Sequence, residues 1–325
     1  MKNYLKTLTI LVIFNTSHYS VYAWGFFGHK KINEIAVYTL PPEMFGFYKL
    51  HSCFLIEHAV DADKRRYAVK EEACRHFLDG DFYEKALPLD TIPRKWKAAI
   101  AKYGMDTITT HGIVPWHVQV MFYRLTEAFR KRDYYKILRY SADLGHYVGD
   151  CHVPLHATGN YNGQKTGQHG IHGLWESRLP ELYFDNYDLL SGQAVYIEDP
   201  LESAWLAFEG SFALVDSVLR AEKELSRLFP EDRKFAFEPR GNLTIKVYSE
   251  SFSKAYQSKM GTMVESRMRS AIALLGNLWY TAWVNAGQPD LDKINKDTAP
   301  IEDVPEEIPA PVAAPALLLI RPEDD

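Results

Sequence analysis

The sequence predicts a single all-α domain. Apolar residues recur at intervals of three and four along the chain, strand-like alternation is rare, and 46% of the 325 residues are hydrophobic, which suffices to bury one substantial core. We therefore expect a multi-helix domain over residues 24–288. Helical spacing is clearest in two runs: Ile32, Ile35, Ala36 and Leu40, and then Val264, Met268, Ile272, Leu275 and Trp279.

The first residues have the pattern of a secretory signal peptide. Lys2 and Lys6 precede an apolar run over residues 8–14, and a polar stretch then leads to Ala23. We expect cleavage between Ala23 and Trp24, so that residues 1–23 are removed and the mature protein is secreted or periplasmic. The apolar run is shorter than the ~20 residues that a spanning helix needs, so no transmembrane segment is expected.

The net charge excludes one class of partner. A formal charge of −5 provides no basic surface of the kind that follows a duplex backbone, so duplex-specific DNA binding is not expected. An anionic substrate would have to be attracted by something other than lysine and arginine. We expect a monomer.

The three cysteines, Cys53, Cys74 and Cys151, leave at least one sulfur unpaired and are assigned no catalytic role.

The middle and the end of the chain differ in pattern. From Tyr134 to about His152 the apolar spacing predicts a central helix, in which Gly145 and Gly149 lie one turn apart and leave room for close packing. Residues 154–171 are rich in Gly, Asn, Gln, Thr and His, which indicates an irregular surface loop. Residues 289–325 are rich in Pro, Ala and acidic residues and predict a flexible, disordered tail.

Histidines and carboxylates at helical spacing carry the predicted chemistry. His146 and Asp150 lie four residues apart on the central helix, so both can face one ion, and His156 follows just after Pro154. His172 and Glu176 repeat the spacing of four. A single such pair is usually an ordinary pair on a helix surface, but two pairs and a third histidine in one short region indicate a zinc site.

Other histidines and acids have plainer interpretations. Taken alone, His76 is more often a buried, hydrogen-bonded histidine than a ligand, and Asp61 and Asp63 could form a solvated turn. Six further histidines have no such partners in the sequence and are assigned no metal role: His51, His58, His111, His117, His152 and His169.

Four motifs occur in an order that is typical of one superfamily. They are WGFFGH at residues 24–29, HFLDGD at 76–81, HYVGDCHVPLH at 146–156 and HGLWE at 172–176. With them the chain, from residue 24 to about 287, resembles the superfamily that unites zinc-dependent phospholipase C with the single-strand-specific zinc nucleases of the fungal and plant type. The resemblance implies an all-helical domain of that type with a site for three zinc ions.

The resemblance also implies ligands for each ion. The first zinc would be held by Asp63, His76, His146 and Asp150, and the second by His156, His172 and Glu176. The third would be held by His29, by Asp150 as a bridge, and by the α-amino nitrogen and carbonyl oxygen of Trp24. Trp24 becomes a ligand only when the signal segment is removed, because an amide nitrogen has no available lone pair. Asp61 remains an alternative to Asp63.

The activity implied is hydrolysis of phosphodiesters by a metal-bound hydroxide, with Asp150 bridging the metals and Asp63 orienting or deprotonating the water. The favoured substrate is single-stranded nucleic acid, as for an endonuclease or nucleotidase, with Phe77 stacking on a base and Asp79 hydrogen-bonding it. The alternative is a phospholipase C acting on phospholipid head groups.

The departures from the family patterns are mixed. Trp175 is nuclease-like, whereas Glu176 is phospholipase C-like. Val153 replaces a glutamine frequent in both branches, and Ile171 replaces an asparagine typical of the nucleases. Two hypotheses from other classes are a non-catalytic zinc-binding helical protein and a plain helical bundle with structural histidines. A decayed site should show gaps in the ligand set, and a plain bundle should bind less than one zinc per chain.

Overall fold

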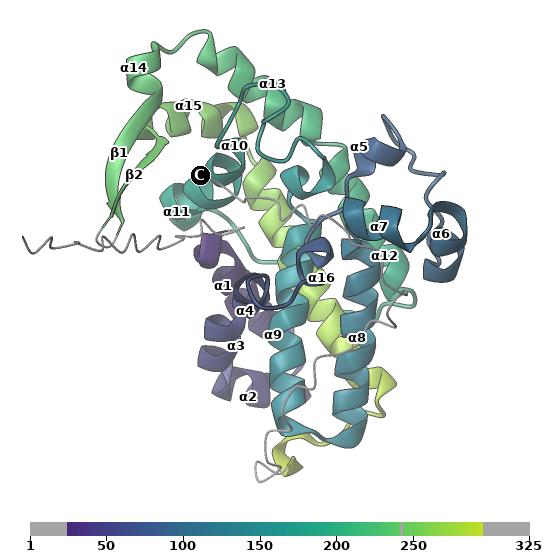
Figure 1. Ribbon diagram of the computed structural model, residues 1–325. Helices are drawn as coiled ribbons and strands as arrows, with labels where there is room; N and C mark the ends of the chain where they lie inside the picture. Colours follow the sequence, from purple (N-terminus) through teal and green to yellow (C-terminus); the bar gives the residue numbers. More distant parts are fainter. Residues whose placement is uncertain (1–24, 241–242, 295–325) are drawn as a thin grey trace, which may run out of the picture.

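Three long helices form the centre of the structure, a computed structural model that describes residues 25–240 and 243–294. They are α8 (Val114–Lys131), α9 (Tyr134–Cys151) and α16 (Met263–Asn285), and they pack together along the long axis of the molecule (Figure 1). A tight turn joins α8 to α9, so these two helices run in opposite directions. The predicted all-α class is therefore confirmed.

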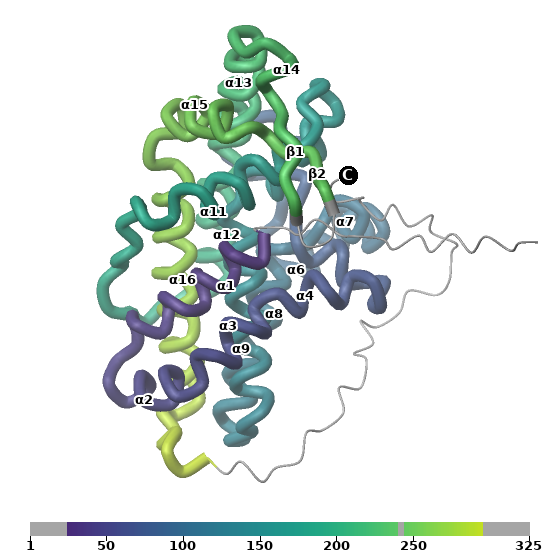
Figure 2. The backbone as a smooth tube through the Cα atoms, turned by 90° about the vertical axis from the view of Figure 1, so that its left-hand side faces the viewer, coloured from purple at the N-terminus to yellow at the C-terminus, as the bar shows by residue number. Residues whose placement is uncertain are grey.

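Shorter elements surround the three central helices on several sides (Figure 2). On one side lie α1 (Gly25–Ala36), α2 (Pro42–Leu50), α3 (Ser52–His58) and α4 (Asp61–Arg65). Another side carries α5 (Gly80–Tyr83), α6 (Trp96–Tyr103), α7 (Met105–His111) and α12 (Pro200–Phe212). One end carries α10 (Ile171–Gly173), the π-helix η4 (Leu174–Arg178), α11 (Leu179–Tyr183), α13 (Val215–Ser226), α14 (Glu231–Lys234) and α15 (Glu250–Met260). Short 3-10 turns are η1 (Val37–Thr39), η2 (Ala73–Arg75), η3 (Pro154–Ala157), η5 (Phe184–Asn186) and η6 (Leu291–Lys293).

The two strongest helical patterns in the sequence form the helices they predict. The side chain of Asp133 accepts a hydrogen bond from the Lys136 amide and caps α9, which satisfies one of the free donors of its first turn. The helix ends at Cys151, one residue before the predicted end. All five apolar positions predicted for the C-terminal helix are buried within α16, so the burial of their side chains stabilises the helix against α8 and α9.

The first helix is shorter than its apolar spacing predicts. α1 ends at Ala36, and the chain continues through η1 to Leu40, which is extended. The Thr39 hydroxyl donates to the carbonyl of Ala36 at 2.7 Å, and two prolines follow Leu40. Proline disfavours a helical conformation in the residue before it, so the helix stops although Leu40 is buried as predicted.

An antiparallel hairpin is the one sheet in the described residues, and the sequence prediction missed it. Strands β1 (Phe235–Arg240) and β2 (Leu243–Tyr248) pair in register, with Phe235 opposite Tyr248. The signal was present in the sequence, because Thr244 and Lys246 alternate with apolar neighbours and a Gly-Asn pair separates the strands. The hairpin lies at the same end of the molecule as α13, α14 and α15.

The segment 154–171 is irregular, as predicted, but only residues 164–167 and 169 of it are exposed. Thr158, Asn160, Asn162 and Gln168 are all buried. Side chains of the segment form hydrogen bonds with its own backbone. The side-chain Oδ1 of Asn160 accepts from the backbone amide of Lys165 at 2.7 Å, and Oδ1 of Asn162 accepts from the backbone amide of Gly170 at 2.8 Å. Such bonds remove the penalty of burying an irregular backbone, so the polar composition indicated internal hydrogen bonding rather than exposure.

The ends of the predicted domain differ from the structure in one respect. The helical body continues to Ile294, because Leu291 and Ile294 are buried against it and the Trp283 indole donates to the carbonyl of Pro289 at 2.9 Å. The predicted signal segment 1–23, the ligand candidate Trp24 and residues 295–325 of the predicted tail lie outside the described residues. The three cysteines are free. None of the described helices is both long enough and apolar enough to cross a bilayer.

Candidate metal centre

Helix α9 supplies the two central side chains of the site. His146 and Asp150 are fully buried and lie one turn apart on the same face of the helix, as their spacing predicts. The Nδ1 atom of His146 lies 2.9 Å from the carbonyl of Ala59 and so carries the proton donated there. Its Nε2 atom then presents a lone pair at 3.3 Å from Asp150 Oδ2.

Two glycines of α9 allow helix α1 to approach closely enough to deliver His29. A Cβ atom at Gly149 would lie 2.9 Å from His29 Nδ1, and one at Gly145 would lie 2.4 Å from the side chain of Asn33. The His29 ring stacks on His146 with centroids 3.9 Å apart, and its Nε2 lies 3.5 Å from Asp150 Oδ1. The close packing expected at these glycines therefore positions a candidate ligand.

Asp63 and His76 come from two further segments of the chain, Asp63 from α4 and His76 from the residue just after η2. His76 Nδ1 lies 3.0 Å from both Asp150 Oδ2 and His146 Nε2, while Asp63 Oδ1 lies 3.4 Å from His146 Nε2. Asp61, the alternative to Asp63, faces away from the site and binds His58 and Lys64 instead. The structure thus brings Asp63 into the cluster and leaves Asp61 outside it.

A second part of the site is formed by the end of the buried segment and the π-helix. His156 donates through Nδ1 to the carbonyl of His76 at 2.6 Å, which leaves its Nε2 at 3.4 Å from Glu176 Oε2. His172 Nε2 also contacts Glu176 Oε2. Glu176 lies in the wide π-helical turn η4, a type of turn that is frequent at functional sites.

Together these eight residues form three groups that could each hold a metal ion. In every group the candidate ligand atoms lie within 4.8 Å of one another, and all residues are buried. The groups are Asp63 with His76 and His146, His156 with His172 and Glu176, and His29 with His146 and Asp150. The group of His156, His172 and Glu176 is the same as the ligand set implied for the second zinc. The other two differ from the implied sets: Asp150 is grouped with His29 and not with Asp63 and His76, His146 lies in both groups, and Trp24 lies outside the described residues.

The donors in this cluster fit a set of cations better than they fit one another. Among the described residues, several of their buried polar atoms have no hydrogen-bond partner: both ring nitrogens of His29, both oxygens of Asp63 and Glu176, Oδ1 of Asp150 and Nε2 of His156. Buried polar atoms are normally paired, and leaving one unpaired costs about 1–3 kcal/mol. Imidazole nitrogens and carboxylate oxygens without thiolates are a common zinc donor set.

The ionisation of the cluster supports the same interpretation. Burial alone would raise the pKa of Asp63, but the neighbouring charge of protonated His146 lowers it to about 2. Burial lowers the pKa of His146, but Asp150 and Asp63 outweigh it and raise the pKa to about 9. In the same way Glu176 and Asp150 raise the pKa of His156 to about 8 against the effect of burial. Without metal, protons on the imidazoles balance the carboxylates, and cations that bind would displace them.

The two predicted substrate-binding residues differ in position. Asp79 lines a cavity of about 210 Å³ together with Phe82, Lys85, His111 and Lys165. Phe77 is not among its lining residues and is 6% exposed, and a Cβ at Gly112 would overlap its carbonyl and ring. Phe82, which the sequence did not single out, is 51% exposed and stacks on His111 with centroids 3.5 Å apart.

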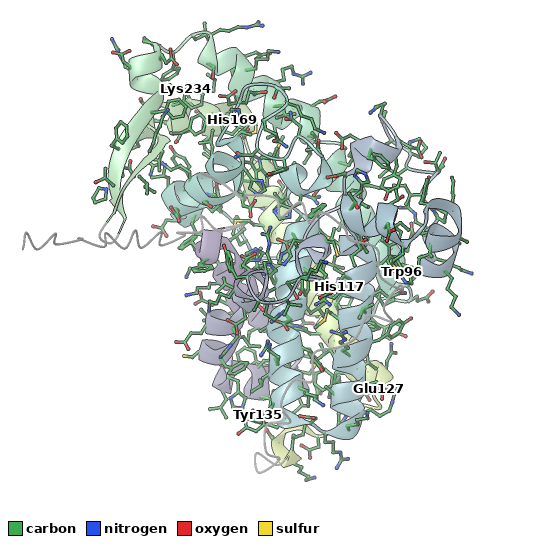
Figure 3. The ribbon with its side chains drawn as sticks, in the orientation of Figure 1. Trp96, His117, Glu127, Tyr135, His169 and Lys234 are labelled. Carbon is green, nitrogen blue, oxygen red and sulfur yellow. The ribbon has the colours of Figure 1, made fainter. Side chains whose placement is uncertain are left out.

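Two histidines that were assigned no partner do have carboxylate partners. His111 Nδ1 lies 3.1 Å from Asp79 Oδ2, and His58 binds Asp61. Neither lies in a metal-binding group. His117 and His169 also lie apart from these groups (Figure 3). His117 is buried against Tyr147 with ring centroids 4.4 Å apart, and burial lowers its pKa well below the ordinary value.

Comparison with known proteins adds little to this geometry. No protein-family model matches the chain, and no curated protein matches it. Among solved structures the chain is similar to the crystal structure of Clostridium perfringens alpha-toxin from an avian strain. The identity is 14%, the TM-score is 0.40, and the match covers 82% of this chain and 64% of the toxin chain. This chain therefore spans slightly less than two thirds of the toxin's length, and we base its function on the site residues.

Proposed function

We propose that this protein is a secreted, zinc-dependent hydrolase of phosphoric esters from the superfamily of zinc phospholipases C and single-strand-specific zinc nucleases. The observation that carries the proposal is the cluster of three buried groups of histidines and carboxylates around α9. A single His-carboxylate pair has structural explanations, but eight buried histidines and carboxylates gathered in three groups, with polar atoms of His29, Asp63, Asp150 and Glu176 left without a hydrogen-bond partner in the described residues, are costly for the fold alone.

The proposed ligands are the residues of these three groups, with the mature N-terminus at Trp24 completing the group of His29, His146 and Asp150. Zinc ions bound there would lower the pKa of a water molecule and neutralise the charge of a phosphate ester. Zinc also explains how a chain with a net charge of −5 could attract an anionic substrate. We propose a monomer, since the site is assembled from one chain.

Asp63 has the position of a residue that orients the attacking water. It is buried, it belongs to the group that contains His76 and His146, and neither of its oxygens has a hydrogen-bond partner in the described part of the chain. A carboxylate so placed can accept a hydrogen bond from a water molecule or take its proton. We therefore assign Asp63 the role of orienting or deprotonating the attacking water.

The cavity beside Asp79 supports a nucleic-acid substrate. Asp79 and Gly159 follow the ligand candidates His76 and His156 by three residues each, and the amide of Leu78 donates to the carbonyl of His156 at 3.0 Å. Two residues that line the cavity are therefore close in the chain to two of the proposed metal ligands. It offers an aromatic surface at Phe82, a carboxylate for a base amine, and two lysines for phosphates. In this proposal Phe82 replaces Phe77 as the stacking residue.

A larger cleft supports the second candidate, a phospholipase C. It has a volume of about 830 Å³ and lies between the hairpin and the segment that carries His172 and Glu176. Apolar side chains on its walls include Leu174, Phe229, Phe235, Ile245 and Val247. An acyl chain would be stabilised on such walls by the hydrophobic effect, whereas single-stranded nucleic acid would gain less.

The first experiment compares hydrolysis of single-stranded DNA, RNA and phosphatidylcholine by zinc-loaded protein that begins at Trp24. The control is the same protein extended by one residue at its N-terminus, which lacks the free amine at Trp24. A second control is the same protein after chelation of its metal. Release of nucleotides alone supports the nuclease, and release of phosphocholine alone supports the phospholipase C. Silence on all three substrates despite bound zinc would favour a non-catalytic zinc protein and contradict the proposal.

A further inference from the structure

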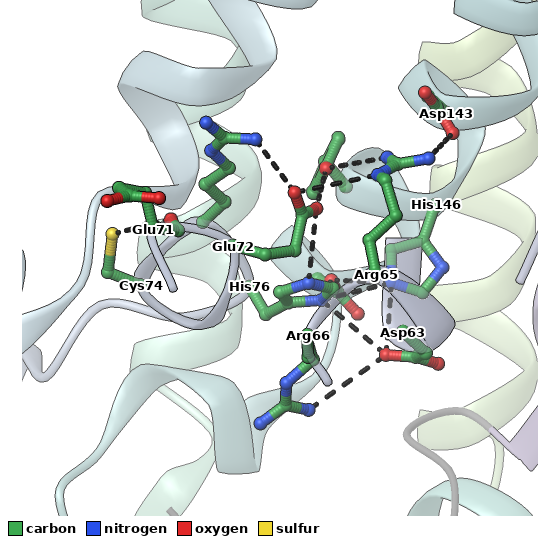
Figure 4. A network of polar contacts seen from close by, with 12 residues as sticks. Asp63, Arg65, Arg66, Glu71, Glu72, Cys74, His76, Asp143 and His146 are labelled. Carbon is green, nitrogen blue, oxygen red and sulfur yellow. Dashed lines mark hydrogen bonds and ion pairs between the residues drawn. The ribbon is translucent and has the colours of Figure 1, made fainter. Parts of the chain in front are cut away.

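A buried glutamate that belongs to no metal-binding group lies directly behind His76. Glu72 is completely buried and precedes His76 by four residues. The two nitrogens of the His76 ring face opposite ways: Nδ1 lies 3.0 Å from Asp150 Oδ2 inside the cluster, whereas Nε2 lies 3.6 Å from Glu72 Oε1 on the outer side (Figure 4). Glu72 therefore contacts the candidate ligand on the side turned away from the metals.

Glu72 is held in place by donors on both of its oxygens. Arg75 donates to Oε2 at 2.7 Å, and the Tyr147 hydroxyl donates to Oε1. Arg65 lies 3.6 Å from Oε2 and in turn donates to Asp143 at 3.0 Å and to Tyr147 at 3.2 Å. Tyr147 follows His146 in α9, so these contacts attach Glu72 to the helix at the centre of the site. With both oxygens engaged, Glu72 is not placed to be a metal ligand itself.

We propose that Glu72 is a positioning residue for the metal centre, which accepts the Nε2 proton of His76 and so fixes the tautomer that turns the Nδ1 lone pair toward the metal. A neutral imidazole has one N–H and one lone pair. Its ligating nitrogen is therefore decided by what the other nitrogen binds. The separation of 3.6 Å exceeds an ordinary N–H···O distance by about 0.6 Å, which a small rotation of the ring or carboxylate would close.

Two other histidines of the cluster, His146 and His156, are held in a different way from His76. His146 and His156 donate their outer protons to the carbonyls of Ala59 and His76, at 2.9 and 2.6 Å. These carbonyls are neutral acceptors. Behind His76 stands a full negative charge, which increases the electron density available at Nδ1 more than a carbonyl does. The Glu72 contact should therefore strengthen the binding of one ion in particular.

The inference rests on the proposed metal centre, and the test measures metal binding separately from activity. Glu72→Gln keeps the volume of the side chain but removes its charge. The matched control is Glu222→Gln, because Glu222 is also completely buried and pairs with Gln168, Tyr248 and Lys234 at 2.6, 3.1 and 2.7 Å. It belongs to no metal-binding group. Both variants should lose stability, but only Glu72→Gln should change the metal site.

Metal-free protein is titrated with Zn²⁺ against a chromophoric chelator, and with Co²⁺ while its visible absorption is recorded. We expect Glu72→Gln to bind one of the ions about 10–100-fold more weakly and to shift the Co²⁺ absorption band, whereas Glu222→Gln should match the wild type in both. If Glu72→Gln does not fold, Glu72→Asp takes its place, since it keeps the charge opposite Arg75 and withdraws it from His76.

Two results would overturn the inference, and they differ in meaning. A folded Glu72 variant with wild-type zinc affinity and an unchanged Co²⁺ spectrum would show that Glu72 serves the fold alone, while the proposed function would stand. A wild-type protein that takes up no metal would overturn the metal centre and this inference together. A loss of melting temperature without any change in metal binding counts as the first of these results.

Discussion

Two of the buried charge clusters in the described residues, one around Glu222 and one around Asp150, are satisfied in different ways. Around Glu222 both carboxylate oxygens receive hydrogen bonds, from Gln168 on one and from Ser226 and Tyr248 on the other, and Lys234 balances the charge. Around Asp150 the carboxylates and imidazoles approach one another, and several of their atoms have no hydrogen-bond partner among the described residues. The first cluster is satisfied by donors of the protein itself, whereas the second is a set of groups that could hold metal ions.

The difference separates structural from functional burial. A buried charge with a full set of donors contributes to a unique fold, or at least costs little, while one without donors is kept only where something else binds it. Burial of polar residues is therefore a weak sign of function when considered alone. The stronger sign is burial together with missing partners, which is concentrated around Asp150 and the residues next to it, His29 and Asp63.

The largest effect is expected from Asp150→Asn. The substitution preserves shape but removes the negative charge at the centre of the cluster, where Asp150 lies 3.0 Å from His76 and 3.5 Å from His29. We expect hydrolysis to fall by at least ~10³-fold, which corresponds to roughly 4 kcal/mol of transition-state stabilisation. Helical content measured by circular dichroism should be unchanged. Glu222→Gln should show the reverse, with activity near that of the wild type and a loss of about 1–3 kcal/mol in the free energy of unfolding.

Retained activity in Asp150→Asn would contradict the proposed mechanism and place Asp150 with Glu222 among the structural carboxylates. If Asp150→Asn loses activity because it unfolds, His146→Ala is tested in its place. For that variant we expect the same loss of hydrolysis with a folded chain. In both variants zinc content is measured beside activity, so that loss of metal and loss of turnover are separated.

The sequence predicted the metal-binding side of this comparison better than the structural side. Spacings of four residues on one helix, as in His146 and Asp150, are local and survive folding unchanged. The Glu222 cluster joins α13, the 154–171 segment and β2, so no local pattern indicates it. Glu72 was missed although it precedes His76 by four residues, because spacing does not show on which side of the ring a carboxylate lies; its contacts with Arg65 and Tyr147, which come from other parts of the chain, were not predictable.

Polar composition misled the prediction where side chains hydrogen-bond to their own segment. Asn160 and Asn162 read as surface residues but are buried, since they satisfy the backbone around them. The hairpin was missed for a different reason, because only two short strands alternate and helical periodicity dominates the rest of the chain. His111 was assigned no role because no partner lies near it in the sequence, but in the fold its Nδ1 lies within hydrogen-bonding distance of Asp79.

A smaller effect is expected where α1 meets α9. In Gly149→Ala the new Cβ would lie 2.9 Å from Nδ1 and 3.0 Å from Cε1 of His29, so the His29 ring or the whole of α1 must shift. Displacing a ligand by a fraction of an ångström should lower activity by about 10–100-fold and weaken one zinc ion. The control is Gly46→Ala in α2, where nothing lies within 4 Å of the added atom. It should leave activity unchanged and stabilise the helix by up to ~1 kcal/mol.

Equal activities in the two glycine variants would show that His29 tolerates displacement and contributes no ligand. The measurement is zinc content and hydrolysis on the same preparations, with melting temperature as a check on folding. A loss of hydrolysis and zinc content in Gly149→Ala alone would show that α1, through His29, contributes to the metal centre together with α9.

The smallest effect is expected from Asp61→Asn, which we set against Asp63→Asn two residues further along α4. Asp61 binds His58 and Lys64 near the surface, at 2.5 and 2.9 Å, and ion pairs of this kind are worth about 0–1 kcal/mol. Asp63 has no hydrogen-bond partner for either oxygen among the described residues. The substitution Asp63→Asn should therefore lower the rate of hydrolysis by at least ~100-fold, because metal and water binding are lost. Hydrolysis and zinc content of both variants, measured at one pH, decide the assignment. If Asp61→Asn were the inactive one, Asp61 would be the ligand in the folded, metal-loaded enzyme, and α4 would have to rotate on metal binding to bring it into the cluster.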